Sequence, residues 1–296
     1  MSKQTVFKGT FTAIVTPFTA DNQVDLAKLR ELVNWQIEQG VDGLVPCGTT
    51  GESPTLTMEE HVAVMRTVIE ETRRRVPVIA GTGSNNTAES VFLTQKAAAL
   101  KADGALVIMP YYNKPMPAGQ LLHFKAVCAA GRIPVVVYNV PSRTARRIEA
   151  EDIARMYKEI DEVVAVKDAV GDIEFTCKTR SLCDIQILSG DDSMTFPMIA
   201  VGGQGVISVA SNVAPAAVAA MVRTANAGDF PAARKMHYAL WDLFKGLFIE
   251  TNPIPVKTAL ELMGRASARM RLPLSAMEDK NLVKLQAMLR AAKLIV

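Results

Sequence analysis

A lysine at the end of an apolar run is the residue in this sequence with the clearest potential for covalent chemistry. Lys167 directly follows Val163-Val164-Ala165-Val166 and is followed by Asp168. A lysine at the end of a buried strand loses hydration, which lowers its pKa and makes the neutral amine available to attack a carbonyl. A lysine there can also extend to water or pair with Asp168. The position therefore favours imine chemistry without requiring it.

Other polar side chains follow apolar runs elsewhere in the chain. Taken singly, each has an ordinary structural interpretation, because hydroxyls cap helices and turns, tyrosines pack, and loop arginines are solvated. Together they would supply a group that transfers protons in both directions and a guanidinium that binds a carboxylate. With the lysine, this set could carry out imine chemistry without a metal. The set consists of Thr49, Thr50, Tyr111, Tyr112, Tyr138 and Arg143.

The elements that would position these residues follow a repeating pattern. Short β-rich apolar runs alternate with stretches of helical periodicity over residues 1–229, and most runs are continuously apolar, as in strands buried on both faces. An open dinucleotide-binding sheet is disfavoured because the first run lacks a Gly-x-Gly-x-x-Gly turn. The pattern predicts an α/β fold, a (β/α)₈ TIM barrel. The predicted strands are 12–15, 43–47, 76–80, 104–109, 133–138, 163–166, 185–188 and 205–209.

Helical periodicity alone continues after Gly228-Asp229. It predicts three helices, over residues 231–249, 254–263 and 277–292. We therefore expect two domains, a catalytic barrel over 1–229 and a small C-terminal helical domain over 230–296. Because TIM-barrel active sites lie at the carboxyl ends of the strands, the polar residues named above should meet on one face of the barrel.

Composition excludes several classes of protein. The chain has 296 residues, 49% of them hydrophobic, so it can form a sizeable core. A net charge of +3 and 6% aromatic residues do not predict a nucleic-acid interface. No apolar stretch reaches the about 18 residues that a membrane span requires, and the start has no apolar segment of a secretory signal. We expect a cytoplasmic protein that contacts neither nucleic acid nor membrane.

The metal-binding and redox residues are sparse. The four cysteines include no Cys-x-x-Cys pair, and the three histidines have no zinc-site spacing. The sequence therefore predicts four buried free thiols in a reducing compartment, no bound metal and no cofactor.

Several motifs occur in this sequence in the same order as in a known enzyme family. Gly48-Thr49-Thr50-Gly51-Glu52, Tyr138-Asn139-Val140-Pro141 and Val166-Lys167-Asp168 resemble the pyruvate-dependent class I aldolase superfamily, which includes N-acetylneuraminate lyase. Within it, further motifs resemble the dihydrodipicolinate synthase family, and the resemblance extends over essentially the whole chain. The further motifs are Pro110-Tyr111-Tyr112-Asn113, Pro141-Ser142-Arg143-Thr144, Leu188-Ser189-Gly190-Asp191-Asp192 and Asn252-Pro253-Ile254-Pro255-Val256-Lys257.

The resemblance implies a lyase that condenses pyruvate with L-aspartate 4-semialdehyde in lysine and diaminopimelate biosynthesis. Lys167 would form a Schiff base with pyruvate, and Tyr138 would transfer protons during imine formation, enamine formation and cyclisation. Thr49 and Tyr112 would complete a hydroxyl relay to Tyr138. In the family this second tyrosine reaches across from the neighbouring subunit, which implies a homotetramer built as a dimer of dimers.

The resemblance also implies substrate-binding residues. Thr50 and the backbone of Ile207 would hold the pyruvate carboxylate, and Gly190 would line the substrate site. Arg143, at the entrance, would bind the carboxylate of the semialdehyde.

Some family members are inhibited by lysine bound at a subunit interface. Met58 stands where sensitive members carry a histidine, and Pro54 replaces a small residue, so we expect weak or no lysine inhibition. The matching positions that keep polar groups are Ser53, His61, Asn85, Glu89 and Tyr111.

Two other functions share part of this pattern. A superfamily lyase acting on N-acetylneuraminate or on a keto-deoxy sugar acid would share the lysine, the tyrosine and the Gly-Thr-Thr-Gly-Glu loop. Arg143 and Tyr112 favour the synthase, because a sugar-acid lyase needs hydroxyl-binding groups at that rim. A barrel that binds a ligand without catalysis is the second alternative.

Overall fold

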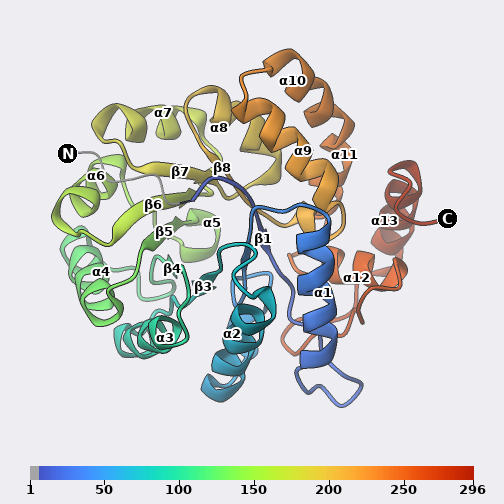
Figure 1. Cartoon of the computed structure of the whole chain (residues 1–296), viewed down its shortest axis with the longest axis horizontal. Helices are drawn as coiled ribbons and strands as arrows, with labels where there is room; N and C mark the ends of the chain where they lie inside the picture. The colour runs from blue at the N-terminus through green and yellow to red at the C-terminus, as the bar shows by residue number, and fades with distance from the viewer. Residues whose placement is uncertain (1–6) are drawn as a thin grey trace.

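Eight parallel strands form the centre of the molecule. The structure is a computed structural model and describes residues 7–296. The strands are neighbours in the order β2-β1-β8-β7-β6-β5-β4-β3, and Figure 1 shows them surrounded by helices. Their bounds are β1 Gly9–Ala13, β2 Gly43–Val45, β3 Ile79–Gly81, β4 Gly104–Ile108, β5 Val135–Asn139, β6 Val163–Asp168, β7 Gln186–Ser189 and β8 Gly205–Ser208.

Backbone contacts between β2 and β3 close the sheet. Leu44 and Val78 form an isolated parallel bridge, and Leu44 N donates to the Pro77 carbonyl over 3.0 Å. Gly81 N donates to the Pro46 carbonyl over 2.9 Å. These contacts join the two ends of the strand order, so the predicted (β/α)₈ barrel is confirmed.

Alternate residues of β5 show why continuously apolar runs form these strands. Val135 and Val137 pack between the sheet and the outer helices, whereas Val136 and Tyr138 pack inside the barrel. A strand with both faces buried requires apolar residues at every position. The same alternation directs the side chain of Tyr138 into the barrel.

Two barrel helices begin at capping side chains. Asp25 caps α1, and Thr57 with Glu60 forms a capping box at the start of α2. The barrel helices are α1 Leu26–Glu38, α2 Met58–Thr72, α3 Thr87–Ala99, α4 Pro117–Gly131, α5 Pro141–Thr144, α6 Ala150–Glu159, α7 Ile173–Leu182, α8 Thr195–Ala200 and α9 Pro215–Asn226, with 3₁₀ turns η1 Ser53–Thr55, η2 Asp192–Met194 and η3 Ala210–Asn212.

The predicted strands are all present, with shifted ends. β1 begins at Gly9, which pairs with Gly205 of β8, and the apolar residues Ile14 and Val15 lie beyond it. Those two residues are apolar because they are buried, not because they belong to the ladder. β6 extends to Asp168, so Lys167 lies within the strand instead of after it.

The C-terminal region contains four helices in the described chain, so the prediction of three is wrong. The expected helix 231–249 is divided at Leu240, whose N–H donates to the carbonyls of Met236 and His237. No Gly or Pro marks this break, and Ala233, His237 and Phe244 keep a helical apolar spacing across it. The helices are α10 Phe230–Ala239, α11 Trp241–Gly246, α12 Ile254–Leu262 and α13 Asp279–Ala291.

Figure 1 shows α12 and α13 on the side of the barrel where α1 lies, and α10 beside α9. The boundary near residue 229 between a barrel and a separate domain remains a prediction. Side chains of α11, α12 and α13 pack in one hydrophobic cluster with side chains of α1, α2 and α9.

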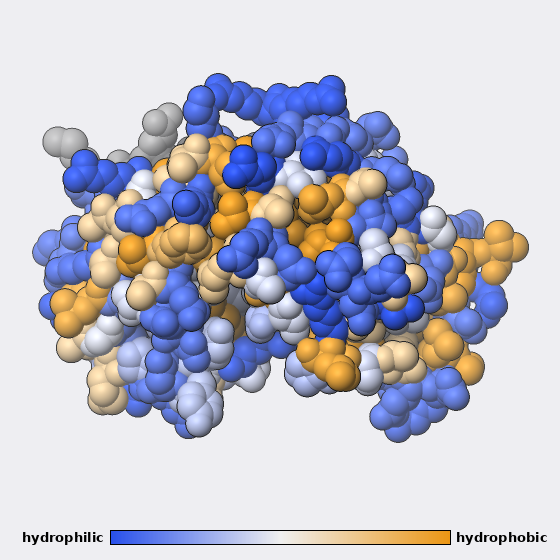
Figure 2. Space-filling model, turned by 90° about the horizontal axis from the view of Figure 1, so that it is seen from below, coloured by the Kyte–Doolittle hydropathy of each residue, from blue (hydrophilic) through white to orange (hydrophobic). Residues whose placement is uncertain are grey.

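The face of the molecule drawn in Figure 2 carries apolar residues in several groups. Figure 2 shows hydrophobic residues between hydrophilic ones on one face of the molecule. Among residues 7–296, no helix combines the length and hydropathy needed to cross a membrane.

The expectation of four buried thiols is wrong for Cys177, which is exposed, and for Cys183, which is partly exposed. Cys177 lies outside the buried face of α7, which Phe175, Thr176 and Thr179 form, and Cys183 directly follows the helix.

Candidate active site

The site begins with two side chains on neighbouring strands. Lys167 of β6 and Tyr138 of β5 are register partners, and Lys167 Nζ lies 4.3 Å from the centroid of the Tyr138 ring. Both side chains are buried, with 5% and 6% of their surface exposed. The strand pairing therefore places an amine against a phenol at the end of the barrel where active sites form.

Burial dominates the protonation of Lys167. Loss of hydration lowers the pKa of its amine, the carboxylate of Asp192 opposes this shift, and the positive charge of Arg143 adds to it, so that the pKa is about 7. At neutral pH a large share of the amine is therefore uncharged, as a nucleophile requires. The sequence-based expectation of a desolvated strand-end lysine agrees with this geometry.

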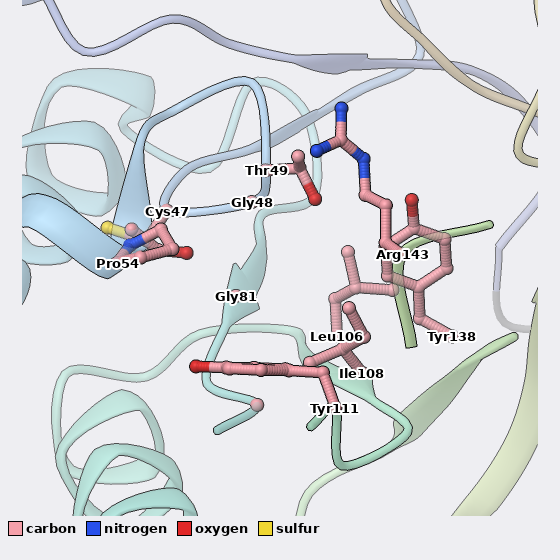
Figure 3. A pocket seen from close by; sticks show the side chains of 12 residues that line it. Cys47, Gly48, Thr49, Pro54, Gly81, Leu106, Ile108, Tyr111, Tyr138 and Arg143 are labelled. Carbon is pink, nitrogen blue, oxygen red and sulfur yellow. The ribbon is translucent and has the colours of Figure 1, made fainter. Parts of the chain in front are cut away.

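Tyr138 is buried among groups that can exchange protons with it. Burial raises the pKa of its phenol, while Arg143 and a hydrogen bond with Thr49 lower it. Figure 3 shows the Tyr138 hydroxyl directed toward Thr49 and Arg143. Thr49 lies in the loop after β2, so strands β2 and β5 contribute to the same contact. Two hydroxyls of the expected relay are therefore in contact.

A cavity of ≈ 220 Å³ opens beside Lys167. It collects five of the predicted residues with Lys167, and the adjoining cavity of ≈ 200 Å³ in Figure 3 shares three of them, Thr49, Tyr138 and Arg143. The lining of the first cavity consists of Thr49, Thr50, Tyr138, Val140, Ser142, Arg143, Lys167, Ala169, Gly190, Asp191, Val209, Phe248 and Asn252.

Asn252 is a site residue to which sequence reasoning gave no role. Its Nδ2 donates to Thr50 Oγ1 over 3.0 Å, and its carbonyl accepts from Arg143 Nη2 over 3.1 Å. Its Oδ1 is buried without a partner in the described chain. Asn252 precedes α12, far from the barrel strands in sequence. The only signal for it was its place in the motif Asn252–Lys257.

Gly190 leaves room for the lysine side chain. A Cβ atom at this position would lie 3.1 Å from Lys167 Cε and 2.7 Å from Ala169 Cβ. Ile207 is buried in β8, and its side chain packs inside the barrel instead of lining the cavity. Any contact of Ile207 with a substrate would therefore be made by its backbone, as the resemblance implies.

Tyr112 does not share a cavity with Lys167 or Tyr138. Its side chain is 88% exposed, its backbone is left-handed at φ 67°, and it lines neither cavity. Within one chain it therefore does not complete the relay between Thr49 and Tyr138.

The residues of the expected lysine-binding site are divided. Ser53 and Tyr111 line the second cavity, where Figure 3 shows the Tyr111 ring across from Arg143. His61 is buried, its Nε2 lies 2.7 Å from the Gly81 carbonyl, and burial lowers its pKa.

The two remaining positions of that group have local partners. The Asn85 carbonyl accepts from Asn113 Nδ2 over 2.8 Å. Glu89 accepts from Ser84 Oγ over 2.6 Å and from Asn86 Nδ2 over 3.3 Å.

Asp192 is a second residue to which the sequence analysis gave no role. It is buried, and its carboxylate accepts from the backbone N–H groups of Val209 (3.0 Å) and Ala210 (2.9 Å) and from the Ser208 hydroxyl. Burial raises the pKa of Asp192 to about 6 despite these bonds. The acidic pair that follows β7 was visible in the sequence, but its burial was not.

The arrangement suits nucleophilic addition to a carbonyl of an anionic substrate. It joins an amine with a lowered pKa, a phenol in contact with a hydroxyl, and a guanidinium at an exposed rim. Among residues 7–296, no cluster of three or more His, Cys, Asp or Glu side chains has the geometry of a metal site.

Comparison with known proteins shows which proteins this chain is similar to. The model of the Dihydrodipicolinate synthetase family matches residues 6–292. The 4-hydroxy-tetrahydrodipicolinate synthase of Nitratidesulfovibrio vulgaris (strain DP4) is 51% identical over 291 residues, which cover 98% of this chain and 99% of that protein.

Solved structures have the same fold. The dihydrodipicolinate synthase from Aquifex aeolicus has a TM-score of 0.96 and 44% sequence identity, over 98% of this chain and 99% of its own. A structure described as the first monomeric dihydrodipicolinate synthase variant has a TM-score of 0.95 and 40% identity, over 98% of each chain.

Proposed function

This chain belongs to the dihydrodipicolinate synthetase family, and from that premise we propose how its own residues carry out the family's reaction. The function is that of a 4-hydroxy-tetrahydrodipicolinate synthase, a lyase of lysine and diaminopimelate biosynthesis. It condenses the small molecules pyruvate and L-aspartate 4-semialdehyde. The observation that carries the assignment of residues is the buried amine of Lys167, whose pKa is lowered to about 7 beside Tyr138.

Lys167 is the nucleophile in this proposal. Its neutral amine adds to the C2 carbonyl of pyruvate, and the resulting carbinolamine loses water to give an imine. Removal of a methyl proton converts the imine into an enamine, whose carbon attacks the aldehyde of the semialdehyde. The amino group of the semialdehyde then attacks the imine carbon, closes the ring and releases Lys167.

Tyr138 transfers the protons in these steps. It donates a proton to the departing hydroxyl of the carbinolamine and accepts protons in later steps. The contact with Thr49 supports this role, because a hydroxyl partner can return or remove the proton of a phenol. Tyr112 completes the relay from a neighbouring subunit, and its exposure of 88% leaves it available to do so.

Three residues bind the substrates. Thr50 and the backbone of Ile207 hold the pyruvate carboxylate, beside Gly190, which leaves space next to Lys167. Arg143 is exposed at the rim of both cavities and binds the carboxylate of the semialdehyde. A guanidinium suits this role because it bonds a carboxylate through two parallel N–H groups.

Assembly and location are part of the proposal. A homotetramer built as a dimer of dimers would bring Tyr112 of one subunit to the relay of another. The related monomeric variant makes sedimentation analysis of the wild-type protein the direct test. The free cysteines are typical of a reducing compartment and support a cytoplasmic location.

Lysine inhibition should be weak or absent. Met58 lacks the imidazole of sensitive family members, and Glu89 is already bonded to Ser84 and Asn86. Titration of lysine into a coupled assay tests this expectation, and inhibition at millimolar or lower lysine would contradict it.

Reductive trapping tests the nucleophile. The protein is incubated with pyruvate and borohydride, digested, and mapped by mass spectrometry. We expect one reduced pyruvate on the peptide that contains Lys167, and an unmodified peptide would overturn the assignment. Activity with pyruvate and the semialdehyde, but not cleavage of N-acetylneuraminate, separates the synthase from the sugar-acid lyase, which the comparisons do not favour.

A further inference from the structure

A buried ion pair connects the loop after β2 with the C-terminal helices. Lys257 Nζ of α12 donates to Glu52 Oε1 over 2.6 Å, although 205 residues separate them. Both side chains are 1% exposed. Both charged groups are therefore out of contact with water. Because removing a charge from water costs free energy, each group needs close polar partners.

Each member of the pair has a second polar partner. Lys257 Nζ donates to the Thr16 carbonyl over 2.9 Å and lies 4.3 Å from the centroid of the Phe18 ring. Glu52 Oε2 accepts from the backbone N–H of Arg271 over 3.2 Å. The pair therefore joins three segments of the chain at the loop after β2.

The backbone of the loop depends on these contacts. Glu52 has a left-handed conformation at φ 53°, which a residue other than glycine keeps only where its surroundings hold it. Its N–H donates to the Thr49 carbonyl over 3.1 Å. The neighbouring Gly51 carbonyl accepts from Thr16 Oγ1 over 2.7 Å. The contacts of the Glu52 side chain thus fix the end of the segment Thr49-Thr50-Gly51-Glu52.

The C-terminal segment contacts the loop on both sides of Gly51. Asn252 bonds to Thr50, and Lys257, five residues further along the chain, bonds to Glu52. Neither Glu52 nor Lys257 lines the cavity beside the catalytic lysine. The ion pair therefore acts on the reaction only through residues that it holds in place, and Thr49 and Thr50 lie within three residues of Glu52 in the same loop.

We propose that the Lys257–Glu52 ion pair is a positioning element of the active site, which holds the loop so that Thr49 meets Tyr138 and Thr50 meets the pyruvate carboxylate. This inference rests on the proposed function, in which those threonines serve the relay and the carboxylate. It assigns to the C-terminal helices a direct part in the geometry of a site that the barrel strands otherwise form.

Two substitutions test the pair. Glu52→Gln offers one acceptor, so either Lys257 Nζ or the Arg271 N–H loses its partner, and Lys257→Met removes the ammonium. At a temperature where circular dichroism shows each variant folded, we expect kcat to fall by about 10-fold to 100-fold, because small displacements of catalytic groups have effects of this size. The KM for pyruvate should change by less than about threefold, because binding of the carboxylate also uses the backbone.

The pH profile separates positioning from a merely structural role. Thr49 lowers the pKa of the Tyr138 phenol. Loss of that contact should move the basic limb of the kcat profile to higher pH in Glu52→Gln and Lys257→Met, as in Thr49→Val. Folded variants with wild-type kcat and a wild-type profile would overturn the inference.

Matched controls complete the test. Lys125→Met breaks an ion pair of the same 2.6 Å length to Glu159 on the outer surface and should leave kcat unchanged. If both buried-pair variants fail to fold, Glu52→Asp decides, since it keeps the negative charge but shortens the side chain that reaches Lys257: a decrease of about threefold or more in kcat supports the inference, and no decrease overturns it.

Reductive labelling keeps this test separate from that of the proposed function. Failure of pyruvate and borohydride to label Lys167 in the wild-type protein would contradict the function itself. Labelled but slow variants support the ion pair's role.

Discussion

Among the residues that the structure describes, two lysines are buried, one at the end of β6 and one in α12. Lys167 is 5% exposed and Lys257 is 1% exposed, and each Nζ lies 4.3 Å from the centroid of an aromatic ring. They differ in their anionic partners. Lys257 bonds to Glu52 over 2.6 Å, whereas no carboxylate of residues 7–296 lies within 4.0 Å of Lys167 Nζ.

The difference indicates that a buried lysine with a contacting carboxylate is a poorer candidate nucleophile than one without such a partner. Burial lowers the pKa of both amines, but the Glu52 carboxylate opposes the shift at Lys257 by direct contact. A contacting carboxylate stabilises the ammonium and occupies its protons. At Lys167 only the charge of Asp192, which makes no direct contact, favours the ammonium, and the charge of Arg143 disfavours it. The amine of Lys167 can therefore lose its proton near neutral pH.

The largest expected effect is on covalent chemistry. Lys167→Ala should lower kcat by about 10⁴-fold or more, as loss of a covalent nucleophile does in other enzymes. It should also abolish labelling by pyruvate and borohydride, while Lys257→Met keeps the label on Lys167. The measurements are a coupled assay and peptide mass mapping. Label on Lys257, or activity of Lys167→Ala within tenfold of wild type, would remove the distinction between the two lysines.

The two lysines should have opposite effects on stability. The folded pKa of Lys167, about 7, lies below its unfolded value of 10.5, so the unfolded state binds more protons between these pH values. Burial of Lys167 therefore lowers the free energy of unfolding. The decrease has its full size below pH 7 and vanishes as the pH rises toward 10.5. Lys167→Met should raise the free energy of unfolding at pH 7 by about 3–5 kcal/mol at most.

Lys257→Met should lower the free energy of unfolding by about 3–5 kcal/mol, because Glu52 stays buried without its partner. Urea denaturation at one fixed protein concentration measures both variants. A loss of stability in both would show that Lys167 is also paired in solution.

The pH dependence of labelling tests the lowered pKa of Lys167 directly. The rate of trapping with pyruvate in wild-type protein should rise about tenfold between pH 6 and 8 and then level off, following the neutral fraction of an amine with a pKa of about 7. Stopped labelling at a series of pH values gives the curve. A rate that still rises steeply at pH 9 would indicate an ordinary lysine.

The smallest expected effect concerns the distant carboxylate. Asp192→Asn should move the midpoint of the labelling curve to lower pH by less than about one unit, because the negative charge of Asp192 raises the pKa of Lys167. Asp168→Asn is the matched control, since the Asp168 carboxylate is buried nearby but bonds to Thr176 (2.7 Å) and the Val170 N–H (3.0 Å). A shift in the control alone would assign the electrostatic role to Asp168.

Much of the barrel and of its reactive side was predictable from local pattern. The apolar runs located all eight strands, and the rule that sites form at strand ends brought Lys167, Tyr138, Thr49, Thr50 and Arg143 together. The predicted ends of the strands were less accurate. Ile14 and Val15, for example, are apolar and buried, but they lie outside β1. The break at Leu240 left no mark, since the helical spacing of apolar residues continues through it.

The long-range contacts of the site could not be predicted in this way. Asn252 and Lys257 belong to a motif, but nothing near them in sequence indicates that they meet Thr50 and Glu52 more than 200 residues away. In the same way, the sequence placed Tyr112 at the mouth of the barrel, whereas the folded chain leaves it exposed.

The sequence by itself determined the order of the elements and most of their apolar buried faces, because periodicity records the two faces of a strand or helix. Only the tertiary structure decided which buried lysine has a carboxylate and which does not. That choice depends on how α12 packs against the loop after β2, a contact made by closing the chain on itself and not encoded in either segment alone.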